Sequence, residues 1–266
     1  MQALVLAAGY GTRMGSLSQN KPKHLLEIKE GIPVIELLVR NLASSRYIEG
    51  IFVITNEKFY AQFEDWVLAV YKEKRIQKPV ILINNKTSSN EERLGSVGDI
   101  LYGLNEIRKV TRVEELFVAQ GDDLNQDLSV NNLIGSYYRR KAATIVVHRG
   151  RVEHLAERFG VIEIDENSRI IITKEKPRLQ DITTTDGTAL ANNGIYIFTK
   201  EDLKNIERYK KETIGDRKEP LDKTGKLFAW MTEQGIQMFS YEHAGRWWDV
   251  GKLEDLESAR KFYQNI

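Results

Sequence analysis

One stretch near the start of the chain is the most informative, Ala3-Leu4-Val5-Leu6-Ala7-Ala8-Gly9-Tyr10-Gly11-Thr12-Arg13-Met14. Its apolar half predicts a buried strand over Ala3–Leu6, and the glycine turn that follows leaves room for main-chain N–H groups to close around phosphate oxygens. Two cations, Arg13 and Lys23, come soon after the strand, the second within Pro22-Lys23-His24-Leu25-Leu26. Because these cations supply the charge needed to hold a triphosphate, the stretch indicates phosphate binding.

Two common phosphate loops do not fit this stretch. A Walker A loop ends in Gly-Lys-Ser/Thr, whereas Gly11 is followed by Thr12 and Arg13. A dinucleotide-binding loop has a third glycine where this chain has Met14. The longer string Leu-Ala-Ala-Gly-x-Gly-Thr-Arg-Met, with Pro22-Lys23 after it, resembles the signature of the sugar-1-phosphate nucleotidylyltransferases (NDP-sugar pyrophosphorylases). From the residues alone, an ordinary strand and turn with a solvated loop stays open.

Length and composition restrict the class of protein. The 266 residues carry 39 basic and 38 acidic side chains, so the net charge points neither to nucleic acid nor to a membrane as a partner. The chain has no cysteine, which excludes disulfides, thiolate catalysis and cysteine-based zinc sites. The apolar start lacks a preceding cationic segment and is too short for a signal peptide or a membrane span. We therefore expect a cytoplasmic protein, and the sequence leaves homo-oligomer formation open.

The first 150 residues alternate short apolar runs with amphipathic segments. This alternation predicts an α/β protein with a Rossmann-like, mostly parallel sheet that helices flank on both faces. In such sheets ligands bind beyond the carboxyl ends of the strands, where the loop from Gly9 to Lys23 lies. The predicted strands are Ala3–Leu6, Ile51–Thr55, Pro79–Asn84, Leu116–Ala119 and Ala143–His148, and the predicted helices are Pro33–Ser44, Phe59–Tyr71, Ser96–Arg108 and Val130–Arg140.

The pattern changes after about residue 150. Phe159–Ile164 and Arg169–Thr173 predict a hairpin around a polar turn. No proline-, glycine- or serine-rich linker divides the chain, so we expect a single domain over 1–266. Its halves are a nucleotide-binding half (1–150) and a smaller β-rich half (151–266), which the resemblance identifies with sugar-phosphate binding. Further elements are predicted in the second half, the strands Asn193–Phe198 and Ile236–Tyr241 and the helices Glu201–Arg208, Leu221–Thr232 and Leu253–Tyr263.

Two aspartates stand where a metal site is expected. Gln120-Gly121-Asp122-Asp123 follows a predicted strand, and a carboxylate beside a glycine is placed there to hold Mg²⁺ against a phosphate. Asp249 lies in Arg246-Trp247-Trp248-Asp249-Val250-Gly251, before the last predicted helix. The residues alone also allow a turn or helix cap at both places. The resemblance implies that Asp122 and Asp249 are the ligands of Mg²⁺, because the family has its metal-binding aspartates in these motifs.

Two segments of the second half resemble the family's sugar site. In Glu157-Arg158-Phe159-Gly160-Val161-Ile162 a glycine opens a strand, which permits close approach of a ligand. Lys174-Glu175-Lys176-Pro177 offers an acceptor for sugar hydroxyls and a cation for a phosphate. The resemblance implies that Glu175 contacts the sugar hydroxyls, that Lys176 binds the sugar phosphate and that Gly160 lies against the sugar. Asn193-Gly194-Ile195-Tyr196 resembles a segment that walls the sugar pocket, which adds Asn193 to the expected substrate contacts.

A further segment, Leu94-Gly95-Ser96-Val97-Gly98, resembles less closely the stretch that borders the nucleobase in this family. It implies that Gly95 presents its backbone to the base and that Asn90 reaches a base edge. Asp99 is an unexpected charge beside it, and the segment departs from uridylyl and thymidylyl patterns. The choice of base therefore stays open. The resemblance also places the nucleotide against the N-terminal stretch, at Leu6, Ala8, Gly9, Gly11 and Thr12.

The reaction that the resemblance implies converts an NTP and a sugar 1-phosphate to an NDP-sugar and pyrophosphate, by in-line attack on the α-phosphate. The nucleophile is a phosphate oxygen that already carries charge at neutral pH, so the reaction needs no general base. Arg13, Lys23 and Asp122 are the expected catalytic residues, and Mg²⁺ is the expected cofactor. Two alternatives stay open. One is transfer to a non-sugar phosphate such as phosphocholine or an inositol phosphate, and the other is a non-catalytic nucleotide-sensing subunit.

Overall fold

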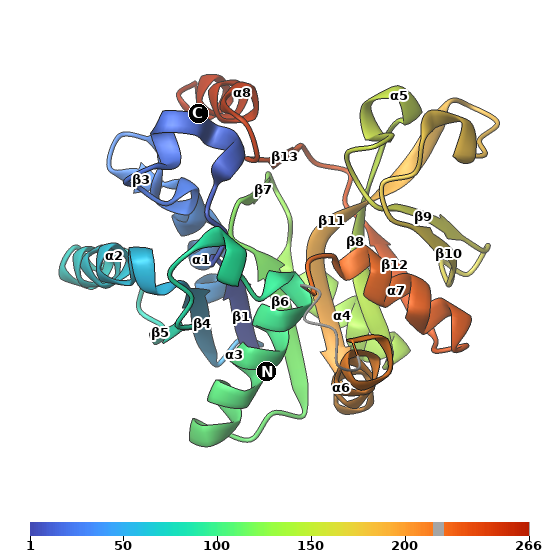
Figure 1. Ribbon diagram of the computed structural model, residues 1–266, viewed down its shortest axis with the longest axis horizontal. Helices are drawn as coiled ribbons and strands as arrows, with labels where there is room; N and C mark the ends of the chain where they lie inside the picture. The colour runs from blue at the N-terminus through green and yellow to red at the C-terminus, as the bar shows by residue number, and fades with distance from the viewer. Residues whose placement is uncertain (215–220, 266) are drawn as a thin grey trace.

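The computed structural model describes residues 1–214 and 221–265. In this part of the chain nine strands form one twisted sheet, which runs through both halves of the molecule (Figure 1). The strands are β1 (Gln2–Leu6), β4 (Gly50–Thr55), β5 (Val80–Asn84), β6 (Glu115–Gln120), β8 (Ala143–Arg151), β9 (Val161–Ile164), β10 (Ile170–Lys174), β11 (Thr188–Thr199) and β12 (Met238–Glu242).

The order of the strands fixes where a ligand can bind. The main path is β10-β9-β11-β6-β1-β4-β5, and β8 pairs with the other edge of β11 and with β12. Strands β6, β1, β4 and β5 are parallel, and Leu6 at the end of β1 lies beside Gln120 at the end of β6. The chain turns from β1 toward β4 and β5 and later returns to place β6 on the opposite side of β1. This reversal makes a crevice at the carboxyl ends of β1 and β6, the usual ligand position in such sheets.

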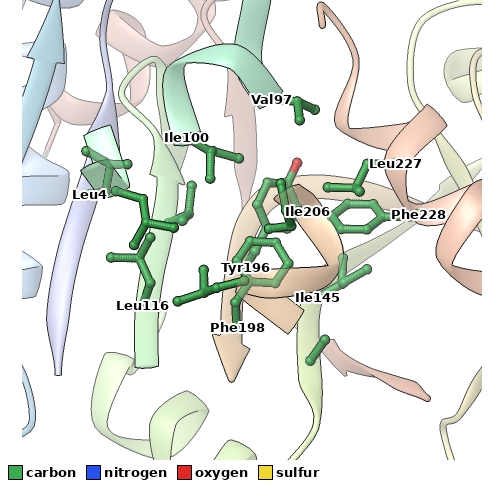
Figure 2. Packing of buried hydrophobic residues seen from close by; sticks show 14 of the residues in the cluster. Leu4, Val97, Ile100, Leu116, Ile145, Tyr196, Phe198, Ile206, Leu227 and Phe228 are labelled. Carbon is green, nitrogen blue, oxygen red and sulfur yellow. The ribbon is translucent and has the colours of Figure 1, made fainter. Parts of the chain in front are cut away.

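Helices cover both faces of the sheet. Leu4 and Leu6 of β1 point to one face, and Ala3 and Val5 point to the other, so the apolar run of β1 is buried on both sides. Figure 2 shows the first of these cores, in which Leu4 belongs to the same cluster as Ile100, Tyr196 and Phe228. This first face is covered by α3 (Gly95–Val110), α6 (Lys200–Ile214) and α7 (Thr224–Glu233), and the second by α1 (Val34–Ser44), α2 (Tyr60–Lys72) and α4 (Val130–Arg140).

A third apolar cluster joins the two ends of the chain above the crevice. Met14 and Leu26, from the segment after β1, pack with Leu124, Val250 and Leu256. Figure 1 shows the consequence, because the blue N-terminal segment lies beside the red helix α8 (Leu253–Tyr263). Two short ribbons support this arrangement, β2 (Glu27–Lys29) with β3 (Ile32–Pro33) and β7 (Asp123–Asn125) with β13 (Trp247–Asp249).

The predicted fold class is confirmed, with boundaries that shift by a few residues. The parallel half of the sheet is as predicted, whereas β11 runs antiparallel to its neighbours and is twice as long as the predicted Asn193–Phe198. Asp249 ends strand β13 and does not simply precede the last helix. Among the described residues, no helix combines the length and the apolar character that crossing a bilayer requires. The remaining short helices are α5 (Val152–Leu155), η1 (Thr12–Ser18), η2 (Lys23–Leu25), η3 (Glu57–Phe59), η4 (Asn90–Glu92) and η5 (Leu179–Asp181).

Candidate active site

A cavity of about 420 Å³ lies at the carboxyl ends of β1 and β6. This volume is in the range of small-molecule sites in proteins. Its lining comes from both halves of the chain and is rich in charged side chains. The predicted residues that line it are Leu6, Ala8, Gly9, Arg13, Lys23, Gly95, Asp122, Gly160, Glu175, Lys176 and Asp249.

The loop after β1 is held in place from the neighbouring strand. The amide of the buried Asn56 donates to the carbonyl of Ala8 at 2.9 Å, and Ala7 donates its N–H to Ile54. Gly11 has a φ of +66°, which favours glycine, and its carbonyl accepts from the Ser18 hydroxyl at 2.6 Å. The chain then enters η1, where Arg13 lines the cavity and Met14 is buried in the third cluster. The Arg13 side chain thus lines the cavity and follows a loop whose backbone is held by hydrogen bonds.

Lys23 and Asp122 form a buried ion pair on the cavity wall. The Lys23 ammonium group donates to the Asp122 carboxylate, and each side chain is only 11% exposed. Burial disfavours the charged form of each group, but the attraction between opposite charges outweighs this effect. The carboxylates of Asp122 and Asp249 raise the pKa of Lys23 above its usual value, and Lys23 holds the pKa of Asp122 below its usual value. Both groups are therefore charged at neutral pH.

The β7–β13 ribbon brings Asp249 to the same place. Asp249 pairs in register with Asp123, and the N–H of Val250 donates to the carbonyl of Asp122 at 3.0 Å. Burial raises the pKa of Asp249, and the charge of Asp122 raises it further. Arg13 lies close enough to lower that pKa in turn. The three predicted groups Arg13, Asp122 and Asp249 therefore converge on one cavity from segments that are far apart in the sequence.

The same cluster contains a third carboxylate, that of Asp123. Burial raises the pKa of Asp123 well above its usual value, and the charges of Asp122 and Asp249 raise it further. The Trp247 indole N–H donates to Asp123 at 2.9 Å and fixes its orientation. Trp247 thus supports an acidic residue of the site, in addition to its packing against Phe159.

These carboxylates fit a divalent cation that is shared with a substrate. Within residues 1–214 and 221–265, no three His, Asp or Glu side chains are gathered closely enough to hold a metal unaided. Asp122 and Asp249 nevertheless supply two carboxylates to a cavity that is also lined by the cations Arg13, Lys23 and Lys176. One or two carboxylates completed by phosphate oxygens and water is the arrangement that Mg²⁺ adopts with nucleotide substrates. The mutual repulsion of these acids, which raises the pKa of Asp123 and of Asp249, is a repulsion that a bound cation would relieve.

His24 is a buried neighbour of this cluster. Burial lowers its pKa to about 3, so the imidazole stays neutral at physiological pH. Its ring packs against Phe63, and its Nδ1 has no hydrogen-bond partner among the described residues. Gly121 lies between the His24 ring and the Leu6 carbonyl, where a Cβ would come within 3.0 Å of that oxygen. His24 therefore shapes the floor of the cavity and adds no charge to it.

The opposite end of the cavity is built from the second half of the chain. Phe159 and Gly160 come before β9, and Glu175 and Lys176 follow β10, at the near end of the predicted hairpin. Burial raises the pKa of Glu175, and the neighbouring cations Lys176, Lys223 and Lys226 act against this shift. A buried carboxylate beside lysines offers a hydrogen-bond acceptor together with positive charge. This combination suits a polyol that carries a phosphate.

Four of the predicted residues do not line the cavity, Gly11, Thr12, Asn90 and Asn193. The clearest correction concerns Asn193, which is fully buried and donates its amide to Asn125 at 2.8 Å. Asn192 lines the cavity in its place. The reason is an irregularity of β11 between Asn192 and Tyr196, where Gly194 has a φ of +83°. Because this bulge breaks the alternation of side chains, the sequence pattern did not show which asparagine faces inward.

Several lining residues were not predicted. Arg93 pairs with Asp222 at 2.7 Å and so ties the loop before α3 to the segment before α7. The predicted Gly95, with a φ of +76°, lies directly under this segment, and a Cβ there would come within 2.5 Å of Leu221. No local signal marks the pair of Arg93 and Asp222, because the two residues are 129 positions apart in the chain. The other unpredicted lining residues include Ser96, Gln120, Lys223 and Thr224.

A protein-family model described as nucleotidyl transferase matches residues 2–266. The chain belongs to the nucleotidyl transferase family. The match spans the parallel half, the hairpin and the Asp249 segment, so it includes every element that lines the cavity. This nucleotidyl transferase thus has Arg13, Lys23, Asp122 and Asp249 within the region that matches its family.

Individual relatives are more distant. A UTP–glucose-1-phosphate uridylyltransferase from Synechocystis sp. is 24% identical over 265 residues, which is 97% of this chain and 62% of the relative. A UDP-glucose pyrophosphorylase solved with UDP-glucose has a TM-score of 0.78 at 20% identity, covering 99% of this chain and 98% of that one. A putative glucose-1-phosphate thymidylyltransferase from Bacillus anthracis, in complex with a sucrose, has a TM-score of 0.76 at 22% identity, covering 100% and 96%. These structures share the fold of this chain.

Proposed function

We propose that this chain transfers a nucleotidylyl group from an NTP to a sugar 1-phosphate, which yields an NDP-sugar and pyrophosphate. One observation carries the proposal: Arg13, Lys23, Asp122 and Asp249 meet in a cavity whose other end holds Glu175 and Lys176. The cations and acids suit a metal-bound triphosphate, and the far end suits a phosphorylated polyol. The names of the uridylyltransferase and thymidylyltransferase relatives support the same reaction class.

The central difficulty of this reaction is electrostatic. An oxygen of the sugar phosphate attacks the α-phosphorus, that bond forms as the bond to pyrophosphate breaks, and all the groups involved are anionic. Two unit charges 4 Å apart repel by about 4 kcal/mol at an effective dielectric constant near 20. Fixed cations offset this repulsion without reorganising during the reaction. Arg13 is placed to stabilise the leaving pyrophosphate, and Lys23 is placed near the α-phosphate.

The acidic residues have a separate task. Asp122 and Asp249 would hold Mg²⁺, which supplies positive charge to the α-phosphate when bound. Lys23 is charged in the ligand-free protein because it pairs with Asp122, so it is already prepared to meet a phosphate. No residue has to remove a proton from the nucleophile, because the sugar phosphate is already ionised at neutral pH. His24 is a weak base in any case, because burial lowers its pKa to about 3.

The second half of the chain positions the acceptor. Lys176 would bind the phosphate of the sugar 1-phosphate, and Glu175 would accept hydrogen bonds from its hydroxyl groups. Gly160 lies against Glu175, and a Cβ there would come within 3.4 Å of the carboxylate, so a side chain would narrow this end of the cavity. We further propose that 1–266 acts as one catalytic unit, with 1–150 holding the nucleotide and 151–266 the sugar phosphate.

The proposal is tested by pyrophosphate release with a panel of NTPs and hexose 1-phosphates, with and without EDTA. We expect Mg²⁺-dependent turnover with at least one pair. We expect Arg13→Ala and Asp122→Asn to lower it by at least about 100-fold, the scale of one preorganised charge contact. Arg139→Ala, an exposed change on α4, is the matched control. Turnover with phosphocholine but with no hexose 1-phosphate would show that the acceptor is a non-sugar phosphate. Nucleotide binding without any turnover would indicate a sensing subunit.

A further inference from the structure

A further buried carboxyl group, that of Asp99, faces the cavity and has no task in the reaction proposed above. Asp99 lies one turn into α3, is 8% exposed and lines the cavity together with Gly95 and Ser96 of the same helix. An uncompensated charge in this position costs free energy, because burial disfavours the ionised form of a carboxyl group. The proposed roles of Arg13, Lys23, Asp122 and Asp249 do not explain why a carboxyl group is buried here.

The order of the sheet places Asp99 at one particular end of the cavity. Its partner Asn85 follows β5, on the far side of β1 from β6. Asp122 follows β6 in the middle, and Glu175 follows β10 at the opposite edge. If the triphosphate lies over β1 and β6 and the sugar lies toward β10, the nucleoside extends toward β4 and β5. Asp99 is therefore beside the nucleobase, and this placement rests on the function proposed above.

A hydrogen-bonded chain fixes the orientation of the Asp99 carboxyl group. The Asn85 side-chain oxygen accepts from the N–H of Thr87 at 3.0 Å and from its hydroxyl at 2.8 Å. The Asn85 amide N–H is thereby turned toward Asp99, whose Oδ1 accepts from it at 2.8 Å. The Thr87 hydroxyl also meets the hydroxyl of Tyr10, from the loop after β1, at 3.0 Å. The network occupies Oδ1 of Asp99 and leaves Oδ2 for another donor.

The described part of the protein supplies no hydrogen-bond donor to Oδ2 of Asp99. Among the described residues, Asn85 alone donates a hydrogen bond to Asp99, whereas a buried carboxylate ordinarily receives several. This shortage is visible in the pKa of Asp99, which burial raises to about 7. A purely structural carboxyl group would gain nothing from facing the cavity, where an asparagine would satisfy the same network. A ligand that donates a hydrogen bond to Oδ2 completes the site.

We propose that Asp99 selects the nucleobase, with its Oδ2 accepting a hydrogen bond from an exocyclic amino group, so that CTP, ATP or GTP is preferred to UTP and dTTP. Cytosine, adenine and guanine each carry such an amino group, whereas uracil and thymine present carbonyl oxygens at the corresponding positions. In its ionised form Asp99 would face a carbonyl oxygen with two acceptors and no proton between them, whereas an amino group donates to the carboxylate and so favours the ionised form. A site that forms a hydrogen bond with a polar group of its substrate rejects an analogue that lacks this group.

The test compares kcat/KM for CTP, ATP, GTP, UTP and dTTP at a fixed sugar 1-phosphate, in the wild type, in D99N and in E106Q. The D99N amide keeps an oxygen for Asn85 and turns an NH₂ group toward the base, so it donates where the carboxylate accepts. We expect the wild type to favour an amino-bearing base by about 10-fold or more, and D99N to lower that ratio by about 10- to 100-fold. E106Q changes an acid farther along the same helix that pairs with Lys109, and it should keep the wild-type ratio.

Binding of the same five NTPs without a sugar phosphate provides a second measurement that does not need turnover. A wild type that prefers UTP or dTTP in binding would overturn the proposal. An unchanged base ratio in D99N would overturn it as well, and near- and far-ultraviolet circular dichroism establishes that this variant is folded. Selective binding of an amino-bearing NTP without any turnover would support the role of Asp99 and would count against the proposed reaction, so the two failures are distinguishable.

Discussion

The ammonium group of Lys23 is bound to the carboxylate of Asp122, a residue 99 positions later in the chain, at a place where both side chains are nearly inaccessible. The pair joins the segment after β1 to the end of β6, the two strands between which the cavity lies. It therefore has a structural consequence in addition to its place in the proposed site. Removing one partner leaves the other as a buried, uncompensated charge.

Lys23→Met should destabilise the ligand-free protein by about 3–5 kcal/mol, the usual cost of breaking a buried ion pair from one side. The loss should be smaller for the double variant Lys23→Met/Asp122→Asn, because it also removes the carboxylate that Lys23 neutralises. Urea unfolding of both variants measures the difference, and the exposed change Lys21→Met serves as the control. Equal losses in the single and double variants would show that the pair does not act as a unit.

Asp249→Asn should raise the Mg²⁺ concentration that gives half-maximal turnover by at least about 10-fold, because a neutral amide is a weaker ligand than a carboxylate. The variant should also require more Mg²⁺ to recover after EDTA treatment. A titration of activity against free Mg²⁺ provides the measurement. Glu254→Gln, an exposed change in the first turn of α8, should leave the titration unchanged. A wild-type Mg²⁺ curve for Asp249→Asn would remove Asp249 from the metal site.

Glu175→Ala should raise the KM for the sugar 1-phosphate by about 10-fold or more and leave the KM for the NTP close to the wild-type value. The reason is the loss of a hydrogen bond to a charged group, which is worth about 1.5–3 kcal/mol. Steady-state kinetics with each substrate varied in turn separates the two constants. Glu166→Ala, in the exposed turn of the β9–β10 hairpin, is the control. An effect on the NTP alone would place Glu175 in the nucleotide site.

Asp99 should make the stability of the protein depend on pH. Its pKa is about 7 in the folded protein against 3.8 as the reference value, so the folded state binds this proton more tightly. The contribution of the group is fully present below pH 3.8 and is lost as the pH rises through about 7, and the total loss is about 4 kcal/mol. D99N lacks this titration, so its stability relative to the wild type should increase from pH 4.5 to pH 8. Urea unfolding at both pH values measures it, and a constant difference would contradict the assignment.

Much of the parallel half was predictable because its signals are local. The apolar run of β1 is buried on both faces by helices, so it lacks alternation and reads as a strand of a parallel sheet. The place of the loop after β1 on the cavity wall was predictable for the same reason, since Gly9, Arg13 and Lys23 lie within one short segment. The short strands β7 and β13 were not, because three residues carry no periodic signal and each strand pairs with a segment that is remote in the sequence.

The inward-facing residues of β11 were also beyond local prediction. Asn192 and Asn193 are chemically identical, and the bulge at Gly194 decides which of them faces the cavity. A side chain at Gly194 would overlap the Asp123 carboxylate, so the need for glycine arises from a residue 71 positions away. The Arg93–Asp222 pair has the same origin, since its two charged groups come from segments 129 positions apart.

The amino-acid sequence by itself determined the class of the sheet, the glycine loop after β1 and the position of Asp122 just after a strand. These depend on hydrophobic periodicity and on motifs of a few neighbouring residues. Only the tertiary structure decided that Asp122, Asp249 and Arg13 share one cavity, that Asn192 replaces Asn193, and that the carboxyl group of Asp99 is buried with a single donor. Distances between remote segments and the burial of a charge are properties of the packed chain, and no local pattern encodes them.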